Sequence, residues 1–318
     1  MRRPELKRIT AALRQLTPAQ RKRVAVELAA LDAQPASTML IEGRFACGAT
    51  CPHCKSMHVI RNGHANGLQR YRCRECCKTF SALTGTPLNR LHKRGKWLDQ
   101  AQALHDGQTL RETARALRIH LSTAHRWRHR FLAVPKTVQP QALTGIAEAD
   151  ETMFLLSFKG KRSGLDRKAR KRGGKATQRG LSHEQVPVLV ARDRAGATMD
   201  CVLKAMDMAT LSVALKPFLA KEVVLCTDGS KAFAGAARKL GIEHHAVNLS
   251  AGIRVDGVWH VQNVNAYHSR LKAWVQKFRG VATCYLANYP GWFRAIDREK
   301  GNSPKPQQWL AMAIGETV

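Results

Sequence analysis

The stretch Ile146-Ala-Glu148-Ala-Asp150-Glu151-Thr-Met-Phe154 alternates in a way that predicts a β-strand with Glu148 and Asp150 on one face. Carboxylates on such a face are out of keeping with an apolar core. A second apolar run, residues 223–227, ends in Asp228 at a Gly-Ser turn, the usual place for functional side chains in α/β folds. We therefore predict that Asp150 and Asp228 lie on neighbouring strands and bind divalent metal. Either aspartate alone is equally well explained as a turn former or a helix cap.

Strand-like and helical runs alternate around these two aspartates. The sequence predicts strands at 145–154, 186–192, 197–203, 223–227 and 244–249. It predicts helices at 211–220, 231–240 and 261–279. This order predicts a mixed α/β domain over residues 145–295.

The predicted helix at 261–279 has two different faces. Apolar side chains at helical spacing form one of them. The other is a polar stripe two turns long, made of Asn265, His268, Ser269 and Lys272. Because a polar stripe is unsuited to a core, we expect it to face a ligand or a functional site.

The charge of the chain indicates a polyanionic partner. Among 318 residues there are 53 Lys or Arg and 23 Asp or Glu, which gives a net charge of +30. Such an excess repels itself in the folded state, and nucleic acid is the commonest partner that compensates it. No apolar run approaches the ~18 residues that cross a bilayer, so we expect no membrane span. Early charges such as Glu5 and Lys7 exclude a signal peptide, so we expect a cytoplasmic protein.

Residues 159–180 concentrate this charge, with ten Lys or Arg against one acid and five glycines. A segment of this composition cannot bury a core. Beside an active site it would grip phosphates independently of sequence. The predicted DNA-binding residues here are Lys168, Arg170, Lys171 and Arg172. The alternative is a solvated loop or a localisation tract.

Six of the nine cysteines lie within residues 47–77. Two Cys-x-x-Cys pairs with 18 residues between them have the spacing of a closed four-cysteine Zn²⁺ site, which predicts a structural zinc ribbon over residues 44–84. The predicted ligands are Cys51, Cys54, Cys73 and Cys76. The alternatives are unpaired core thiols, or a competing ligand among Cys47, His53 and Cys77.

Residues 95–134 predict a helix-turn-helix region. One short helix over 109–119 precedes a second that we expect Ser122 to cap. Ala124, Trp127 and Phe131 share the predicted inward face. The predicted outward residues are Thr123, His125, Arg126, Arg128, His129 and Arg130, a set suited to a major groove. We predict that Thr123, Arg126, Arg128 and Arg130 contact DNA; the alternative is a solvated basic face.

The remaining segments carry no evident chemistry. Residues 1–40 predict a short helical N-terminal segment of two helices, the second opened by Thr17-Pro18 and extending over 19–31. Residues 135–144 predict a linker, and residues 296–318 a C-terminal tail.

The motifs together resemble the DDE-type transposases of bacterial insertion sequences, specifically the ISXO-like group. The resemblance rests on the four cysteines, Asp150-Glu-Thr, Asp228-Gly-Ser-Lys and the segment His260–Lys272, and it covers about residues 40–295. It implies an α/β ribonuclease-H-like catalytic domain, a mixed sheet with helices, preceded by a zinc ribbon and a helix-turn-helix region.

The resemblance also implies a catalytic set of Asp150, Asp228 and Asn265, with Lys272 as a companion. The family usually has Glu where this chain has Asn265. An amide oxygen still binds Mg²⁺, but the site loses one negative charge, which Glu148 or Asp256 would be able to restore. The implied cofactors are Mg²⁺ or Mn²⁺ at the catalytic site, acting by a two-metal mechanism, and structural Zn²⁺.

The expected function is therefore transposition. The protein would cleave and transfer strands of double-stranded DNA, at the element's ends and at a target. We expect it to act as a homo-oligomer in the bacterial cytoplasm, associated with the nucleoid. One alternative is a DNA-binding regulator whose ribonuclease-H-like domain is inactive. Another is a structure-specific nuclease that cleaves without joining.

Overall fold

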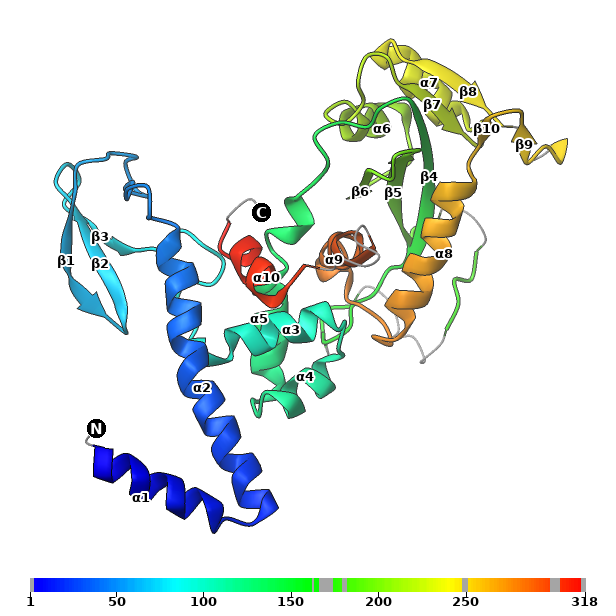
Figure 1. The fold of residues 1–318 in the computed structure, drawn as a ribbon. Helices are drawn as coiled ribbons and strands as arrows, with labels where there is room; N and C mark the ends of the chain where they lie inside the picture. Colours follow the sequence, from blue (N-terminus) through cyan, green and yellow to red (C-terminus); the bar gives the residue numbers. More distant parts are fainter. Residues whose placement is uncertain are drawn as a thin grey trace. The chain divides into compact units, whose positions relative to one another are not determined.

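The computed structural model describes residues 3–161, 163–165, 174–178, 182–247, 251–297 and 304–315 (Figure 1). The chain forms two compact units, Met1–Phe131 with Lys305–Val318, and Leu132–Pro304. Because the predicted DNA-binding residues Lys168, Arg170, Lys171 and Arg172 lie outside the described residues, they stay predictions.

The second unit is built on a mixed five-stranded sheet. Its strands are β4 (Ile146–Leu155), β5 (Gln185–Asp193), β6 (Thr198–Val202), β7 (Val224–Thr227) and β8 (Glu243–Ala246). Their order is β6-β5-β4-β7-β8, with β4, β5 and β6 antiparallel and β7 and β8 parallel to β4. This topology confirms the predicted ribonuclease-H-like fold, and each strand lies within three residues of its predicted bounds.

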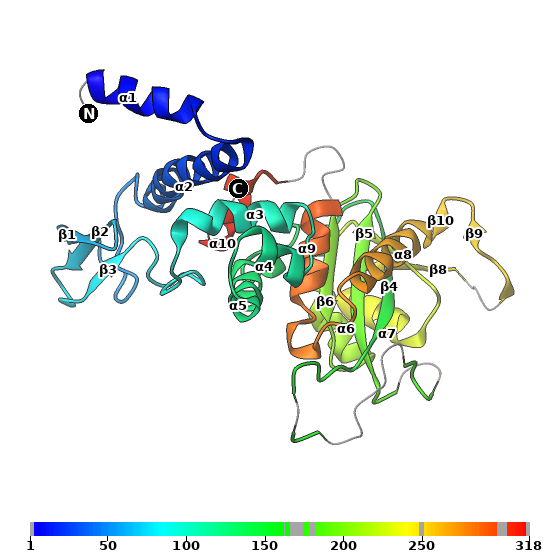
Figure 2. The same cartoon turned by 90° about the horizontal axis from the view of Figure 1, so that it is seen from below.

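Helices cover both faces of this sheet. The helices α6 (Met208–Leu215) and α7 (Lys231–Leu240) bury Leu211 and Phe233 against Ala147 and Ala149 of β4. Because successive side chains of a strand point to opposite faces, Glu148 and Asp150 face away from this core. The helix α8 (Gln262–Gln276) runs along β4 on that other face (Figures 1 and 2).

Two predicted helices differ in their ends. The helix α6 begins at Met208, three residues earlier than predicted, because the side chain of Asp207 caps it by accepting a hydrogen bond from Thr210 N at 2.8 Å. The helix α8 ends at Gln276, and Arg279 adopts a left-handed φ of 52°. A short hairpin of β9 (Val255–Asp256) and β10 (Trp259–His260) precedes α8 (Figure 2).

Part of the predicted linker is packed within the second unit. The 3₁₀ turn η2 (Pro135–Thr137) lies against α9 (Asn288–Asp297), where a Cβ on Gly291 would come within 2.5 Å of Lys136 Cα. The buried Arg294 pairs with Asp200 and donates to the carbonyls of Pro135, Lys136 and Val138 at 3.2, 3.4 and 2.9 Å. The turn η4 (Thr283–Tyr285) precedes α9.

The first unit combines helices with a small three-stranded sheet. Its helices are α1 (Arg3–Arg14), α2 (Pro18–Gly43), α3 (Trp97–His105), α4 (Leu110–Ala116), α5 (Leu121–Phe131) and α10 (Pro306–Ala313), with the turn η1 (Arg94–Lys96) before α3. Thr17 and Gln20 form the capping box of α2, which continues beyond the predicted 31 to Gly43. Within the predicted tail, α10 packs against α3 and buries Trp309. None of the helices in the described segments combines the length and hydropathy that crossing a bilayer requires.

The small sheet is an antiparallel ribbon. Its strands are β1 (Val59–Ala65), β2 (Leu68–Cys73) and β3 (Thr79–Ser81). Tyr71 and Phe80 stack at 5.6 Å between ring centroids, and Phe45 meets both edge-on. So small a sheet buries little apolar area, which is why a metal is a plausible source of its stability.

Candidate active site and DNA-binding surfaces

The pairing of β4 with β7 brings the two predicted aspartates together. The strands are parallel, with Glu148 opposite Cys226. Two residues further along each strand, Asp150 in the middle of β4 therefore lies beside Asp228, which directly follows the end of β7. Asp228 Oδ1 also accepts a hydrogen bond from Ser230 N at 3.1 Å, which shapes the turn into α7. The prediction that these aspartates occupy neighbouring strands is confirmed.

The polar stripe of α8 faces β4. His268 is 6% exposed, and its Nδ1 lies 3.6 Å from Asp150 Oδ2. Its Nε2 is buried and has no hydrogen-bond partner among the described residues. Asn265, half-buried, is one turn before His268, and the exposed Lys272 is about one turn after it. The helix thus presents Asn265, His268 and Lys272 along the side that meets Asp150.

Glu151 was not among the predicted site residues. Burial, together with the neighbouring carboxylates of Asp150 and Asp228, raises the pKa of Glu151 to about 7. Its Oε2 is buried without a hydrogen-bond partner in the described part of the chain. Asp150 and Asp228 offer carboxylate oxygens of the kind that Mg²⁺ or Mn²⁺ binds, whereas Glu151, the next residue of β4, points to the other face of the strand. The donor set therefore fits a divalent cation.

Glu148 and Asp256, the two carboxylates expected to restore the missing charge, have other partners. Asp256 has a side chain 64% exposed, and its Oδ2 lies 3.1 Å from Nε2 of His245. Glu148 is fully buried and accepts hydrogen bonds from the first turn of α8. Both carboxylates are therefore held by these contacts.

A cleft of about 1030 Å³ lies at the carboxyl end of β4, between residues 153–161 and the C-terminal half of α8. Its described lining includes Lys159, Lys161, Lys272 and Arg279 and no acid. Nζ of Lys159 donates to the carbonyls of Phe278, Arg279 and Gly280, at 3.3, 3.2 and 2.7 Å. The cleft is thus a cationic surface suited to phosphates.

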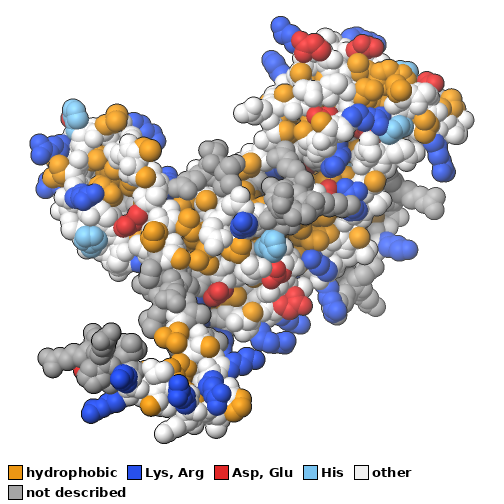
Figure 3. All heavy atoms as spheres, in the orientation of Figure 1, with side chains coloured by type: hydrophobic (Ala, Val, Ile, Leu, Met, Phe, Trp, Pro, Cys, Tyr) orange, Lys and Arg blue, Asp and Glu red, His pale blue; other side chains and the backbone are white. Residues whose placement is uncertain are grey.

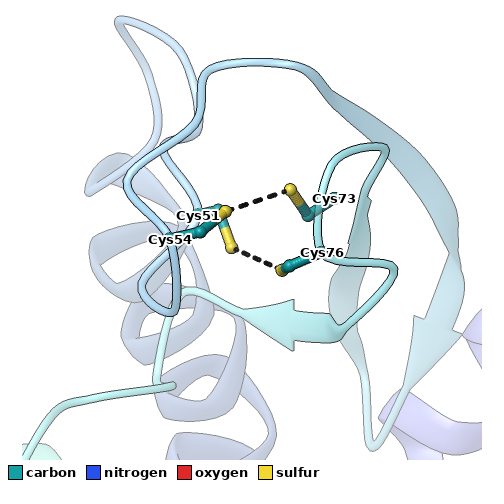
Figure 4. A group of neighbouring side chains, drawn as sticks. All are labelled: Cys51, Cys54, Cys73 and Cys76. Carbon is teal, nitrogen blue, oxygen red and sulfur yellow. Dashed lines mark hydrogen bonds between the residues drawn. The ribbon is translucent and has the colours of Figure 1, made fainter.

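The four predicted zinc ligands form one cluster (Figure 4). Their sulfur atoms all lie within 4.8 Å of one another, with 3.6 Å between Cys51 and Cys76 and 3.5 Å between Cys54 and Cys73. A tetrahedron with Zn–S bonds of about 2.3 Å has sulfur atoms about 3.8 Å apart, so the cluster fits Zn²⁺. Burial opposes ionisation of Cys51, but the N–H groups of Cys54 and His53 outweigh it and lower its pKa to about 7.

The neighbouring cysteines do not join this cluster. Cys47 and Cys77 are both exposed, and Sγ of Cys77 contacts the carbonyl of Arg74 at 3.9 Å. The symmetric Cys-x-x-Cys spacing therefore identified the right set of sulfur atoms.

The second helix of the predicted helix-turn-helix is α5. Ala124, Trp127 and Phe131 are buried, as predicted. The prediction that Ser122 caps the helix is wrong, because α5 begins at Leu121 and Nδ1 of His120 accepts from Ser122 N at 3.3 Å. An imidazole takes the capping role that sequence rules assign to Ser or Thr.

The predicted outward position of Arg128 is also wrong. Arg128 is 1% exposed, and its Nη2 donates to the carbonyl of Gln108 at 2.6 Å and to Oγ1 of Thr113 at 3.4 Å. Burial, together with the charges of His125 and Arg128, lowers the pKa of His129 to about 3, so His129 is neutral. Arg126 and Arg130 are exposed and Thr123 is half-exposed, and Nη1 of Arg130 donates to the carbonyl of Pro87 at 3.0 Å.

Comparison with known families agrees with this geometry. Residues 142–293 match the ISXO2-like transposase domain, and residues 92–133 match a homeodomain-like domain. Residues 142–293 are thus similar to the ISXO2-like transposase domain. The resemblance to ISXO-like insertion-sequence transposases is thereby confirmed.

A relative of the ISXO2-like chain occurs in an archaeal mobile element. An uncharacterized protein in transposable element ISH50 of Halobacterium salinarum is 26% identical over 287 residues, covering 89% of this chain and 96% of the relative. Among solved structures, a chain of the simian T-cell lymphotropic virus intasome in complex with PP2A regulatory subunit B56 gamma is 13% identical over 62% of this chain and 68% of that chain, with a TM-score of 0.28. A chain of a pre-cleavage Mos1 transpososome is 14% identical over 70% and 79%, with a TM-score of 0.22.

The catalytic and the DNA-binding residues that we predicted fall in different matched ranges. The ISXO2-like domain contains Asp150, Asp228, Asn265 and Lys272. The homeodomain-like range contains α3, α4 and α5, and the cysteine cluster lies outside both ranges. Figure 3 shows many Lys and Arg side chains and few acids on the face that it draws.

Truncation of two arginines of α5 should affect two different properties, the stability of the first unit and its binding to DNA. Arg128→Ala leaves buried acceptors unpaired and should destabilise the first unit by about 1.5–3 kcal/mol, measured by thermal unfolding. Arg126→Ala, the matched control two residues away, removes an exposed cation, so it should leave stability unchanged, weaken DNA binding and reduce the salt slope by about one. If Arg128→Ala and Arg126→Ala lose the same DNA affinity and both keep their stability, Arg128 lies on the surface instead.

Proposed function

We propose that this protein is the transposase of an insertion sequence, which cuts DNA strands at the element's ends and joins them to a target. The observation that carries the proposal is the parallel pairing of β4 with β7, which sets Asp150 beside Asp228 under the polar side of α8. The ISXO2-like domain and the relative in a transposable element support it.

Asp150, Asp228 and Asn265 would hold Mg²⁺ or Mn²⁺ in this proposal. When bound, a pair of such ions activates an attacking oxygen and stabilises a leaving one. The reaction is hydrolysis of a phosphodiester to free a 3′-hydroxyl, followed by transesterification in which that hydroxyl attacks a target phosphodiester. Lys272 faces the same cleft as Lys161 and Arg279, so its ammonium group can bind a phosphate next to the scissile one.

The first unit supplies recognition of the element's ends. The ribbon over residues 44–84 and the helix-turn-helix over residues 95–134 would bind double-stranded DNA, with Thr123, Arg126 and Arg130 toward it. Residues 145–295 would form the catalytic domain. Because the two ends of the element would be cut together, the protein would act on DNA as a homo-oligomer.

A strand-cleavage assay with the element's own ends tests the proposal. Purified protein, end-labelled duplex and Mg²⁺ or Mn²⁺ should yield a nick at the element boundary and then joined products, and EDTA should remove both. Tight, sequence-specific binding with no product in either metal would identify a regulator. Cleavage without any joined product would identify a nuclease.

Replacing Asn265 tests its place at the metal. Asn265→Ala should raise the Mn²⁺ concentration for half-maximal cleavage by about 10–100-fold, because an oxygen ligand is lost. Asn265→Asp keeps the oxygen, adds the missing charge, and should lower that concentration below the unaltered protein's. Gln262→Ala, on the same helix and exposed, is the control. Unchanged metal dependence in Asn265→Ala would exclude Asn265 from the site.

A further inference from the structure

Glu148 is a fully buried carboxylate on β4 that no step of the proposed reaction uses. Its Oε2 accepts hydrogen bonds from the backbone N–H groups of Asn263 and Val264, at 2.8 and 3.0 Å. Its Oε1 accepts from Nδ2 of Asn263 at 2.8 Å. The residue before α8, Val261, provides no side-chain cap in the described structure. Glu148 therefore caps α8 from another element, where a negative charge is favoured by the helix dipole.

Arg194 and His260 lie against the same carboxylate. Nη1 of Arg194 lies 3.2 Å from Oε1, and Nδ1 of His260 lies 3.4 Å from it. Nη2 of Arg194 also donates to the carbonyl of Val258 at 3.0 Å, within the β9–β10 hairpin. A buried charge is tolerated only when it is paired and fully hydrogen-bonded, and Glu148 meets both conditions. The network therefore fastens three elements, the end of β5, the hairpin and α8, to one side chain of β4.

The position of Glu148 links two proposed metal ligands. It is two residues from Asp150 on the same face of β4, about 7 Å along the strand. The N–H that it binds on Val264 belongs to the residue directly before Asn265. Each connection is a short piece of regular backbone, so a shift of the carboxylate displaces Asn265 relative to Asp150.

We infer that Glu148 is a positioning residue of the site: its carboxylate fixes α8 on β4 and so sets Asn265 and Asp150 at the separation that a shared divalent cation requires. The inference rests on the proposed function. Glu148 does not bind the cation itself, because its oxygens are committed to the N–H groups of α8. Ligand placement of this kind commonly changes metal affinity by about 10–100-fold.

The test measures Mn²⁺ affinity of the full chain without DNA, by electron paramagnetic resonance of free Mn²⁺, beside strand cleavage. Glu148→Gln keeps the size and removes the charge, and Glu148→Asp keeps the charge and shortens the reach. Both should bind Mn²⁺ about 10–100-fold more weakly, with cleavage partly restored at saturating Mn²⁺. Glu243→Gln, an exposed carboxylate of β8 in the same sheet, is the matched control and should bind like the unaltered protein.

A second variant separates positioning from folding and from direct ligation. Asn263→Ala removes one exposed side chain that donates to Glu148, so it should also weaken Mn²⁺ binding, and its effect should not add to that of Glu148→Gln. If folded Glu148 variants and Asn263→Ala bind Mn²⁺ within twofold of the unaltered protein, the inference is wrong. If the unaltered protein itself neither binds Mn²⁺ nor cleaves DNA, the proposed function fails first.

Discussion

Asp150→Asn and Asp228→Asn are each expected to abolish metal-dependent strand cleavage, with a rate loss on the order of 10³-fold or more. Each change removes a charged oxygen ligand at the shared edge of β4 and β7 and leaves the strand packing intact. Single-turnover cleavage of labelled end DNA measures the loss. DNA affinity, followed by gel shift, should stay the same or rise slightly, because a negative charge has been removed from a surface that binds phosphates.

Asp256→Asn is the control for the change of charge. It makes the same chemical substitution on an exposed aspartate that pairs with His245. It should cleave at the rate of the unaltered protein. Cleavage by either Asp150→Asn or Asp228→Asn at that same rate would mean that the chemistry takes place elsewhere in the molecule.

Cys73→Ser is expected to remove the zinc ion and unfold the ribbon. The four sulfur atoms lie within 4.8 Å of one another, and apparent binding free energies of structural Zn²⁺ in small folds reach about 10–16 kcal/mol. The unaltered chain should contain one zinc per protomer by elemental analysis, and the variant almost none. Limited proteolysis should then cut within residues 44–84, and specific binding to the element's ends should disappear.

Cys77→Ser separates ligation from general loss of a thiol. Cys77 is exposed and adjacent to Cys76, but its sulfur contacts a backbone carbonyl outside the cluster. This variant should keep its zinc and its resistance to protease. A full complement of zinc in Cys73→Ser would overturn the four-cysteine assignment.

The sequence was most informative where local rules are strong. Hydrophobic alternation predicted β4 and an apolar run predicted β7, and the carboxylates of Asp150 and Asp228 indicated that the two strands are neighbours. The helix predicted at 231–240 coincides with α7, which ends at Gly241 in the left-handed conformation. Cysteine spacing selected the zinc cluster for a similar reason, since each turn fixes two ligands at once.

The misses share a different physical cause. Arg128 lies where a helical projection predicts an exposed side chain, but α4 and the residues before it cover that surface and offer oxygen acceptors. The hydrogen bonding of Glu148 depends on α8, and the raised pKa of Glu151 depends in part on Asp228. Both partners are more than 70 residues away in sequence. Long-range partners of this kind leave no periodic signal in a single sequence. They had to be seen in the fold.

The packing of η2 against α9 has a consequence for building hybrid proteins. Insertion sequences differ in their terminal repeats, so exchanging the DNA-reading half of one transposase for another is an attractive route to new specificity. A splice point within residues 135–138 would replace backbone that fits against Gly291 and is bonded to Arg294. The exchangeable module therefore comprises Met1–Phe131 together with Lys305–Val318, and the residues that look like a spacer belong with the catalytic half.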